Sequence, residues 1–123
     1  MNLTLWIFQA FLAVVFAGSG LAKSTMSRER LLATGQTGIA LFPMPVVRMT
    51  AVAELLAAAG LLLPWGTGIF RVLTPIAALG LCVVMIGAAS SHSRLREPRN
   101  VAANALLFGL ALTVAIGRLV GLG

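Results

Sequence analysis

Four apolar runs, each close to the length needed to cross a bilayer, constrain the fold of this 123-residue chain more than any other feature. They cover about residues 3–22, 46–64, 68–89 and 101–120. A spanning helix needs ~20 mostly apolar residues, because the hydrocarbon core is ~30 Å thick. Only 10% of the residues are charged, against ~25% in an average soluble protein. The sequence therefore predicts an all-α membrane protein, a single domain with four transmembrane helices.

Short connections predict that the four helices form an up-down bundle in which consecutive helices are antiparallel. Pro64 and Gly68 punctuate a tight hairpin between the second and third spans, and Ser90–Asn100 is a short polar loop. Pro75, inside the third span, lacks a backbone N–H. We expect it to kink that helix near Arg71.

The first loop is longer than the others and has a pattern of its own. Ser24–Arg30 is polar and charged, and Leu31, Ile39 and Phe42 then recur at roughly helical spacing. The simplest interpretation is an interfacial helix that lies along the membrane surface. The alternative is a lid that folds back over the mouth of the bundle.

Positive charge is concentrated in two loops. The first loop and its edges hold Lys23, Arg28, Arg30 and Arg48, the third loop holds Arg94, Arg96 and Arg99, and the opposite side holds only Arg71 and Arg118. The positive-inside rule then places the first and third loops in the cytoplasm and both termini outside. These loops can attract anionic lipids and a protein partner. No basic helix of the kind that binds nucleic acid accompanies them.

Two features argue against a cleaved signal peptide and against disulfide chemistry. Residues 1–4 carry no Lys or Arg, and the apolar run that follows is longer than the usual ~7–15 residues of a signal peptide. We therefore expect the first run to be a retained span. Cys82 is the sole cysteine, which excludes an intrachain disulfide and a CxxC redox pair. Its expected role is that of a small apolar residue in the third span.

Glu54 interrupts the apolar run of the second span. A charged side chain at the centre of a spanning helix costs ~2.5–3.5 kcal/mol on insertion scales, so such a residue marks a candidate functional site. An isolated carboxylate in hydrocarbon needs a partner. We expect that partner to be Lys23, at the end of the first span. Arg48 competes, but it lies six residues before Glu54 on the same helix and starts on a different face.

Antiparallel threading brings the polar ends of the four helices to one side of the membrane. Lys23, Glu54, His92 and Asn104 then occupy the same half of the bilayer, one from each helix. We predict that they converge as a polar core or ligand-binding site, in which His92 could exchange protons with Glu54. One His and one Glu are too few for a metal site.

Each of these four residues also has a purely structural interpretation. Lys23 can anchor a helix end at the head groups, His92 can be an ordinary loop residue, and Asn104 can link helices by a hydrogen bond. Glu54 can belong to a structural salt bridge. The other polar residues of the spans are scattered and predict no continuous pore: Gln9, Thr74 and Thr113.

At these positions the chain resembles the DoxX-like family of small bacterial four-span membrane proteins. The matching segments are residues 17–23, 51–56, 63–64, 73–78, 87–92 and 100–104, which together cover nearly the whole chain. The resemblance implies the bacterial cytoplasmic (inner) membrane and a shared polar core of Lys23, Glu54, His92 and Asn104. Relatives include a quinone-linked thiosulfate-oxidising subunit and a membrane partner in an oxidative-stress complex. The extra cysteines of disulfide-using relatives are missing here.

Three functions remain open at the level of sequence. The first is an accessory membrane subunit of a redox system, which docks a partner on its basic loops, can form homo-oligomers, and binds a quinone or another lipophile. No cofactor is fixed by the sequence. The second is a small membrane enzyme with Glu54 and His92 as acid and base. The third is a proton or solute transporter, for which the spans offer no pair of broken helices.

Overall fold

The computed structural model describes residues 2–122, and within that range four helices are long and apolar enough to cross a membrane. They are α1 (Asn2–Thr25), α3 (Met44–Thr67), α4 (Leu73–Arg94) and α5 (Pro98–Leu122). Two short helices occupy the first loop, α2 (Arg28–Ala33) and the 3-10 helix η1 (Thr37–Leu41). The all-helical four-span fold predicted from the sequence is confirmed.

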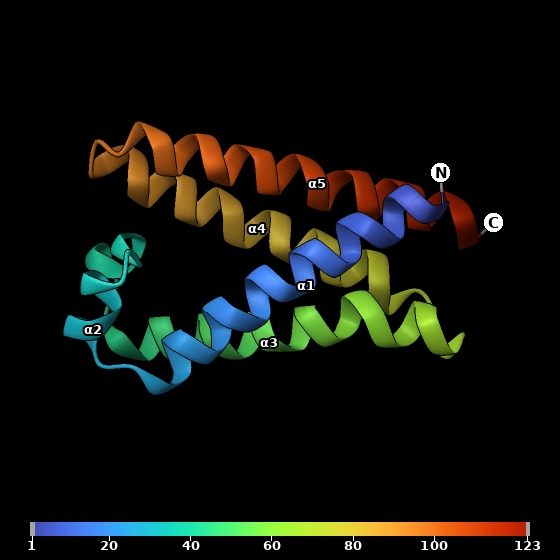
Figure 1. Cartoon of the computed structure of the whole chain (residues 1–123), viewed down its shortest axis with the longest axis horizontal. Coiled ribbons are helices and arrows are strands. Elements are labelled where there is room, and N and C mark those ends of the chain that lie inside the picture. The colour runs from blue at the N-terminus through green and yellow to red at the C-terminus, as the bar shows by residue number, and fades with distance from the viewer. Residues whose placement is uncertain (1, 123) are drawn as a thin grey trace.

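Each long helix packs beside the long helices that precede and follow it. α3 lies between α1 and α4, α4 lies between α3 and α5, and α1 closes the ring against α5. Figure 1 shows both termini at one end of the bundle. It also shows α1 and α3 separating from α4 and α5 toward the other end, where α2 lies. The bundle is therefore closed at the end of the termini and splayed at the end of the first loop.

The closed half is held by an apolar core drawn from all four long helices. Leu12, Leu61, Leu81 and Val114 are completely buried there, one from each helix. Apolar side chains on the outer surface, such as Val14 and Val83, remain exposed along the spans. Since lipid tails cover such a surface, burial inside the bundle is confined to a narrow inner stripe of each helix.

α3 continues through Pro64 to Thr67, where Gly68 ends it in the left-handed conformation with φ of +76°. The apolar run predicts that this span ends near Pro64, and the helix continues past that residue for a specific reason. A proline inside a helix leaves the carbonyl four residues earlier without its N–H donor. Here that carbonyl belongs to Gly60, and it accepts a 2.8 Å hydrogen bond from the Thr74 hydroxyl on α4. The neighbouring helix supplies the donor that Pro64 lacks.

Pro75 does not kink the third span as expected. That span begins at Leu73 rather than near Gly68, so Pro75 falls in the first turn of α4. The first four N–H groups of a helix have no partner within it, and a proline there removes no helical hydrogen bond. The Arg71 carbonyl accepts from the Thr74 N–H at 3.1 Å and is not freed.

The first loop does not form one continuous interfacial helix. Gly35, with φ of +101°, separates α2 from η1, and only a residue without a Cβ adopts this φ without strain. Ser27 is the N-cap of α2, and its side chain accepts from the Arg30 N–H. η1 then turns inward and packs against α4. Of the two interpretations of the first loop, the lid that folds back over the mouth of the bundle describes this segment, and the interfacial helix does not.

We expect Thr74→Val to lower the free energy of unfolding by ~1 kcal/mol, because it leaves the partly buried Gly60 carbonyl without a donor. The loss should shrink in a Pro64→Ala background, where the new N–H can reach the same carbonyl. Reversible unfolding in mixed micelles measures both values.

Thr113→Val is the matched control for this pair. The Thr113 hydroxyl bonds to the Gly109 carbonyl within its own helix, so its removal strands no acceptor. An equal loss in Thr74→Val and Thr113→Val would contradict the role given to Thr74.

Candidate functional site

The Lys23 ammonium and the Glu54 carboxylate form an ion pair between α1 and α3, with 2.6 Å between Nζ and Oε1. Glu54 is fully buried and the Lys23 side chain is 14% exposed. The partner expected from the sequence is therefore confirmed. In surroundings of low dielectric constant, each charge offsets much of the desolvation cost of the other.

A close helix crossing places these two side chains together. A Cβ on Gly20 would lie 3.0 Å from the Ala51 carbonyl oxygen and 2.8 Å from Leu55 Cγ, so only glycine lets α1 approach α3 this closely. Lys23 and Glu54 each follow their crossing residue by three positions. Side chains on a helix lean toward its N-terminus. Because α1 and α3 are antiparallel, the two side chains lean toward each other.

Arg48, considered as a competing partner for Glu54, does not bind that carboxylate. Its guanidinium donates to the Lys23 backbone carbonyl rather than to Glu54. That carbonyl lies in the last turn of α1, where the carbonyls have no donor within the helix. Arg48 therefore caps α1 and leaves Glu54 to Lys23.

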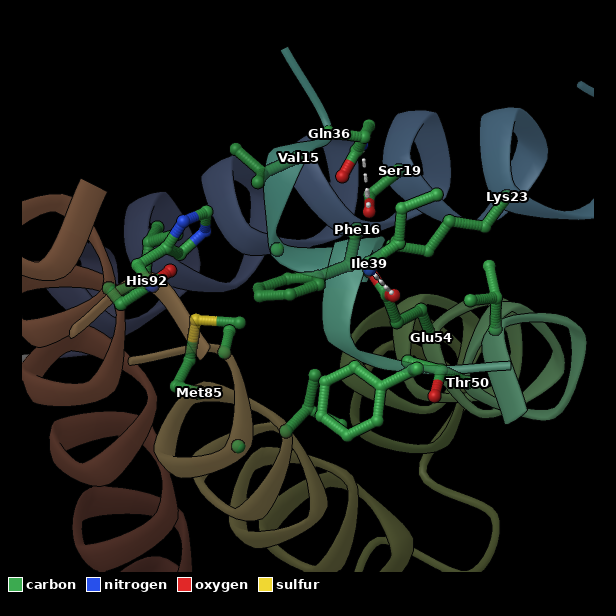
Figure 2. A pocket seen from close by; sticks show the side chains of 18 of the residues that line it. Val15, Phe16, Ser19, Lys23, Gln36, Ile39, Thr50, Glu54, Met85 and His92 are labelled. Atoms are coloured by element: carbon green, nitrogen blue, oxygen red, sulfur yellow. Dashed lines mark hydrogen bonds and ion pairs between the residues drawn. The ribbon is translucent and has the colours of Figure 1, made fainter. Parts of the chain in front are cut away.

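Glu54, Asn104 and His92 line a largely apolar cavity of about 620 Å³ at the splayed end of the bundle. Its walls come from all four long helices and from η1, with Phe16, Ile39 and Met85 among the apolar lining residues. Figure 2 shows these side chains around the cavity, with Lys23 and Glu54 on one side and His92 on the other. A volume of ~300–1,000 Å³ is typical of sites for small molecules.

Two buried polar atoms in the wall of this cavity have no hydrogen-bond partner among residues 2–122. They are Oε2 of Glu54 and Nδ2 of Asn104. Glu54 is fully buried and Asn104 is 8% exposed. One atom is an acceptor and the other a donor. The cavity thus combines an apolar wall with one free acceptor and one free donor.

His92 joins the same cavity but is not bonded to Glu54. Its Nδ1 lies 2.7 Å from Oε1 of Glu97, a residue that the sequence analysis did not single out. The same Glu97 oxygen accepts from the Thr37 hydroxyl at 2.9 Å, and Asn100 Nδ2 lies 3.5 Å from that hydroxyl. The expected proton exchange between His92 and Glu54 has no direct contact to support it.

These contacts attach η1 to α4 as a lid. The buried Ser91 hydroxyl donates to the Gly38 carbonyl at 2.6 Å. A Cβ on Gly38 would lie 3.0 Å from His92 Nε2, so glycine lets the backbone of η1 rest on the imidazole. Leu31 of α2, Ile39 of η1 and Val47 of α3 form a small buried cluster of their own. The cavity is therefore capped by the first loop.

Arg28 holds the lid in shape from the other side. Its guanidinium donates to three carbonyls at the end of η1, those of Ile39, Ala40 and Phe42, at 3.3, 2.8 and 2.8 Å. The neighbouring Arg30 is exposed. Arg28 therefore stabilises the fold of the first loop, and Arg30 takes no part in these three hydrogen bonds.

The opposite end of the bundle is closed by a second polar network that the sequence analysis missed. Arg118 Nε donates to Gln9 Oε1 at 2.6 Å, and Gln9 Nε2 donates to the Leu61 carbonyl. Gln9 is fully buried and Arg118 is 3% exposed. Gln9 therefore joins α1, α3 and α5 across the bundle.

A comparison with protein families matches the DoxX-like family over residues 7–115. Because this match covers most of the chain, the protein belongs to that family. No curated protein and no solved structure matches the chain. The resemblance seen in the polar residues of the sequence is confirmed.

We expect Arg28→Ala to speed amide hydrogen exchange in η1 about tenfold. The hydrogen bonds of a charged donor are worth ~1.5 kcal/mol or more, and ~1.4 kcal/mol corresponds to a factor of ten. Arg30→Ala is the matched control and should leave η1 unchanged. Equal exchange in the two variants would show that Arg28 does not hold the lid.

The attachment of the lid should also depend on pH. Glu97 lies in the loop between α4 and α5, and the hydrogen bond from His92 holds the pKa of its carboxyl below the ordinary value of 4.5. Because the pKa is lower in the folded state, the ionised carboxylate stabilises the fold at pH values above the ordinary pKa. This contribution disappears as the pH falls through the lowered value.

The midpoint of thermal unfolding should therefore fall more steeply below pH 4.5 in the wild type than in Glu97→Gln, and the two should converge in strong acid. Glu29→Gln, which changes an exposed carboxylate, should behave as the wild type does. Parallel curves for wild type and Glu97→Gln would refute the proposed acid dependence.

Proposed function

We propose that this member of the DoxX-like family is a membrane subunit that binds an uncharged lipophilic molecule, with quinones as the candidate class, in the cavity beneath the lid. The observation that carries this proposal is the pair of unpartnered buried atoms in the cavity wall, Glu54 Oε2 and Asn104 Nδ2. Membrane lipids surround the bundle, and the ligand is expected to come from among them.

The free-energy cost of leaving these two atoms without hydrogen-bond partners favours an occupied cavity. An unsatisfied buried donor or acceptor costs ~1–3 kcal/mol, and more when it is charged. A ligand that donates to Glu54 Oε2 and accepts from Asn104 Nδ2 removes both costs at once. The hydroxyl groups of a quinol can both donate and accept, on a ring that suits the apolar wall, whereas the carbonyls of a quinone can only accept, from Asn104.

Charge balance in the cavity supports an uncharged head group. Lys23 already neutralises Glu54, and His92 faces the carboxylate of Glu97. No cation in the described cavity wall is left to pair with an acidic ligand. A carboxylate or phosphate placed there would also face the partly unpaired Glu54, so anionic lipids are disfavoured.

The rim of the cavity supports access from the membrane rather than from water. Phe42, Val46 and Val83 line it, and they are 38%, 40% and 69% exposed. These apolar side chains lie at the start of α3 and along α4, on a surface that lipid tails would cover. A molecule with a long apolar tail could leave its tail in the bilayer and place its head beside Glu54.

The role of accessory subunit is supported by the surface around the lid. Exposed arginines gather in the first and third loops: Arg30, Arg94, Arg96 and Arg99. In the orientation that the positive-inside rule favours, this surface faces the cytoplasm of a bacterial cell and suits a partner with an acidic face. Its proposed role is to dock a redox enzyme that exchanges electrons with the bound quinone.

The two alternative functions have less support. An acid–base enzyme would need Glu54 and His92 to act on one substrate, yet each is held by a different partner, Lys23 and Glu97. A transporter would need a path through the bundle. Gln9 and Arg118 fill the interior at the end of the termini, opposite the cavity.

The proposal predicts an unusual combination in Asn104→Leu. Removing an unpartnered buried donor should raise the free energy of unfolding of the ligand-free protein by ~1 kcal/mol. The same change should lower the amount of co-purifying lipophile at least tenfold. Mild-detergent purification from native membranes, followed by mass spectrometry of bound small molecules, measures the second effect.

Glu54→Gln should also lose the ligand, and Glu29→Gln, in exposed α2, is its matched control. If wild type and Asn104→Leu retain the same molecules in the same amounts, the cavity is not a ligand site. If Asn104→Leu unfolds more easily than the wild type, Asn104 is a structural residue and the proposal loses its main support.

A further inference from the structure

The end of the bundle opposite the cavity contains a buried cation that has no anionic partner among residues 2–122. Arg118 on α5 is 3% exposed, and no carboxylate among residues 2–122 forms an ion pair with it. An arginine side chain remains protonated in proteins. Taking such a charge out of water costs several kcal/mol unless an opposite charge or several hydrogen bonds compensate.

Neutral groups provide only part of this compensation. Arg118 Nε donates to Gln9 and Nη1 donates to Asn2 Oδ1 at 2.7 Å. The guanidinium carbon also lies 4.6 Å from the centre of the Trp65 ring and 5.4 Å from that of Trp6. The third nitrogen, Nη2, is buried and has no hydrogen-bond partner in the part of the chain that the structure describes. Two rings and two amide oxygens leave the positive charge itself uncancelled.

A second arginine adds to this charge. The guanidinium carbon of Arg71, just before α4, lies 3.9 Å from the centre of the same Trp65 ring. Two like charges thus share one indole. The chain has three acidic residues: Glu29 in α2, Glu54 in α3 and Glu97 in the loop before α5. All three are at or near the other end of the bundle. Arg71 is exposed, so an anion can reach this cluster from outside the bundle.

The tryptophans indicate the depth of the cluster in the membrane. Trp and Tyr side chains concentrate at the level of the lipid head groups, where an apolar ring meets a polar surface. Trp6 lies in the first turns of α1 and Trp65 near the end of α3, so both are at helix ends. At this depth the abundant anion is the phosphate of a phospholipid, for which the guanidinium group is well suited.

We propose that Arg71, Trp65 and Arg118 form a binding site for the phosphate group of a phospholipid on the membrane face opposite the lid. Arg71 makes the outer contact with the phosphate. Arg118, which lies against the same Trp65 ring, contributes positive charge that the phosphate neutralises. The site is separate from the cavity beneath the lid and does not depend on the ligand proposed there.

The chain carries its own probe for this site, because Trp6 and Trp65 are its only two tryptophans. We would titrate delipidated protein in an uncharged detergent with short-chain phosphatidylglycerol and follow the fluorescence. The wild type should show a saturable change. Diacylglycerol with the same chains lacks the phosphate and should show none.

Arg71→Gln is the main variant, since Arg71 is exposed and its loss leaves the bonds of Arg118 to Gln9 and Asn2 in place. Its apparent Kd for the phospholipid should rise at least tenfold. Arg99→Gln, which changes an exposed arginine in the first turn of α5, is the matched control and should bind as the wild type does.

Three results would overturn the proposal. The first is an equal Kd in wild type and Arg71→Gln. The second is an equal response to diacylglycerol, which would mean that the phosphate is not recognised. The third is saturation by inorganic phosphate at the same concentration as by the phospholipid, because the site would then take free phosphate rather than a lipid.

Discussion

The ion pair between Lys23 and Glu54 is the interaction on which the splayed half of the bundle depends. Two charges within a membrane protein are tolerable only together, so the pair fixes α1 against α3 at one register. Gly20 makes the register accessible by letting the backbone of α1 rest on Ala51. Lys23 occupies Oε1 of Glu54, and the other oxygen has no partner among residues 2–122, in the wall of the cavity.

The helices are held together by different contacts at the two ends of the bundle. At the end of the termini, α1, α3 and α5 are joined directly by Gln9 and Arg118, and Thr74 satisfies the carbonyl that Pro64 leaves free. At the other end the helices separate and the first loop fills part of the space. Ser91 and Glu97 hold η1 there by a few hydrogen bonds. Few buried contacts and several partly exposed hydrogen bonds are typical of a segment that can open locally.

Much of this arrangement could be predicted from the sequence. Apolar runs of bilayer length dictate the four spans, and antiparallel threading places Lys23, Glu54, His92 and Asn104 in one half of the membrane. The pairing of Lys23 with Glu54 followed from their depth. Arg118 carried a similar signal, since it is a charge inside the fourth apolar run, but it was treated only as a topological marker. Gln9 and Arg118 lie 109 positions apart, and only the packing of α1 against α5 reveals their contact.

Other features depend on details that no spacing rule contains. Whether Pro75 kinks a helix depends on where α4 starts, and the start is set by the turn after Gly68 rather than by the apolar pattern. His92 and Glu97 are separated by the end of a helix and a turn, so helical periodicity does not relate them. The fold-back of η1 includes a close approach of Gly38 to the His92 ring, which the sequence does not indicate. Each of these is a property of tertiary packing.

The most direct test of this account uses the fact that Lys23 is the sole lysine and that the chain has three glutamates. Protein labelled with ¹⁵N at the lysine side chain and ¹³C at the glutamate carboxyl groups can be studied in lipid bilayers by solid-state NMR dipolar recoupling. We predict strong dephasing of the single ammonium signal by one carboxyl carbon, which disappears in Glu54→Gln and persists in Glu29→Gln. Absence of dephasing in the wild type would mean that Lys23 extends to the head groups instead, and the account of the cavity would then be wrong.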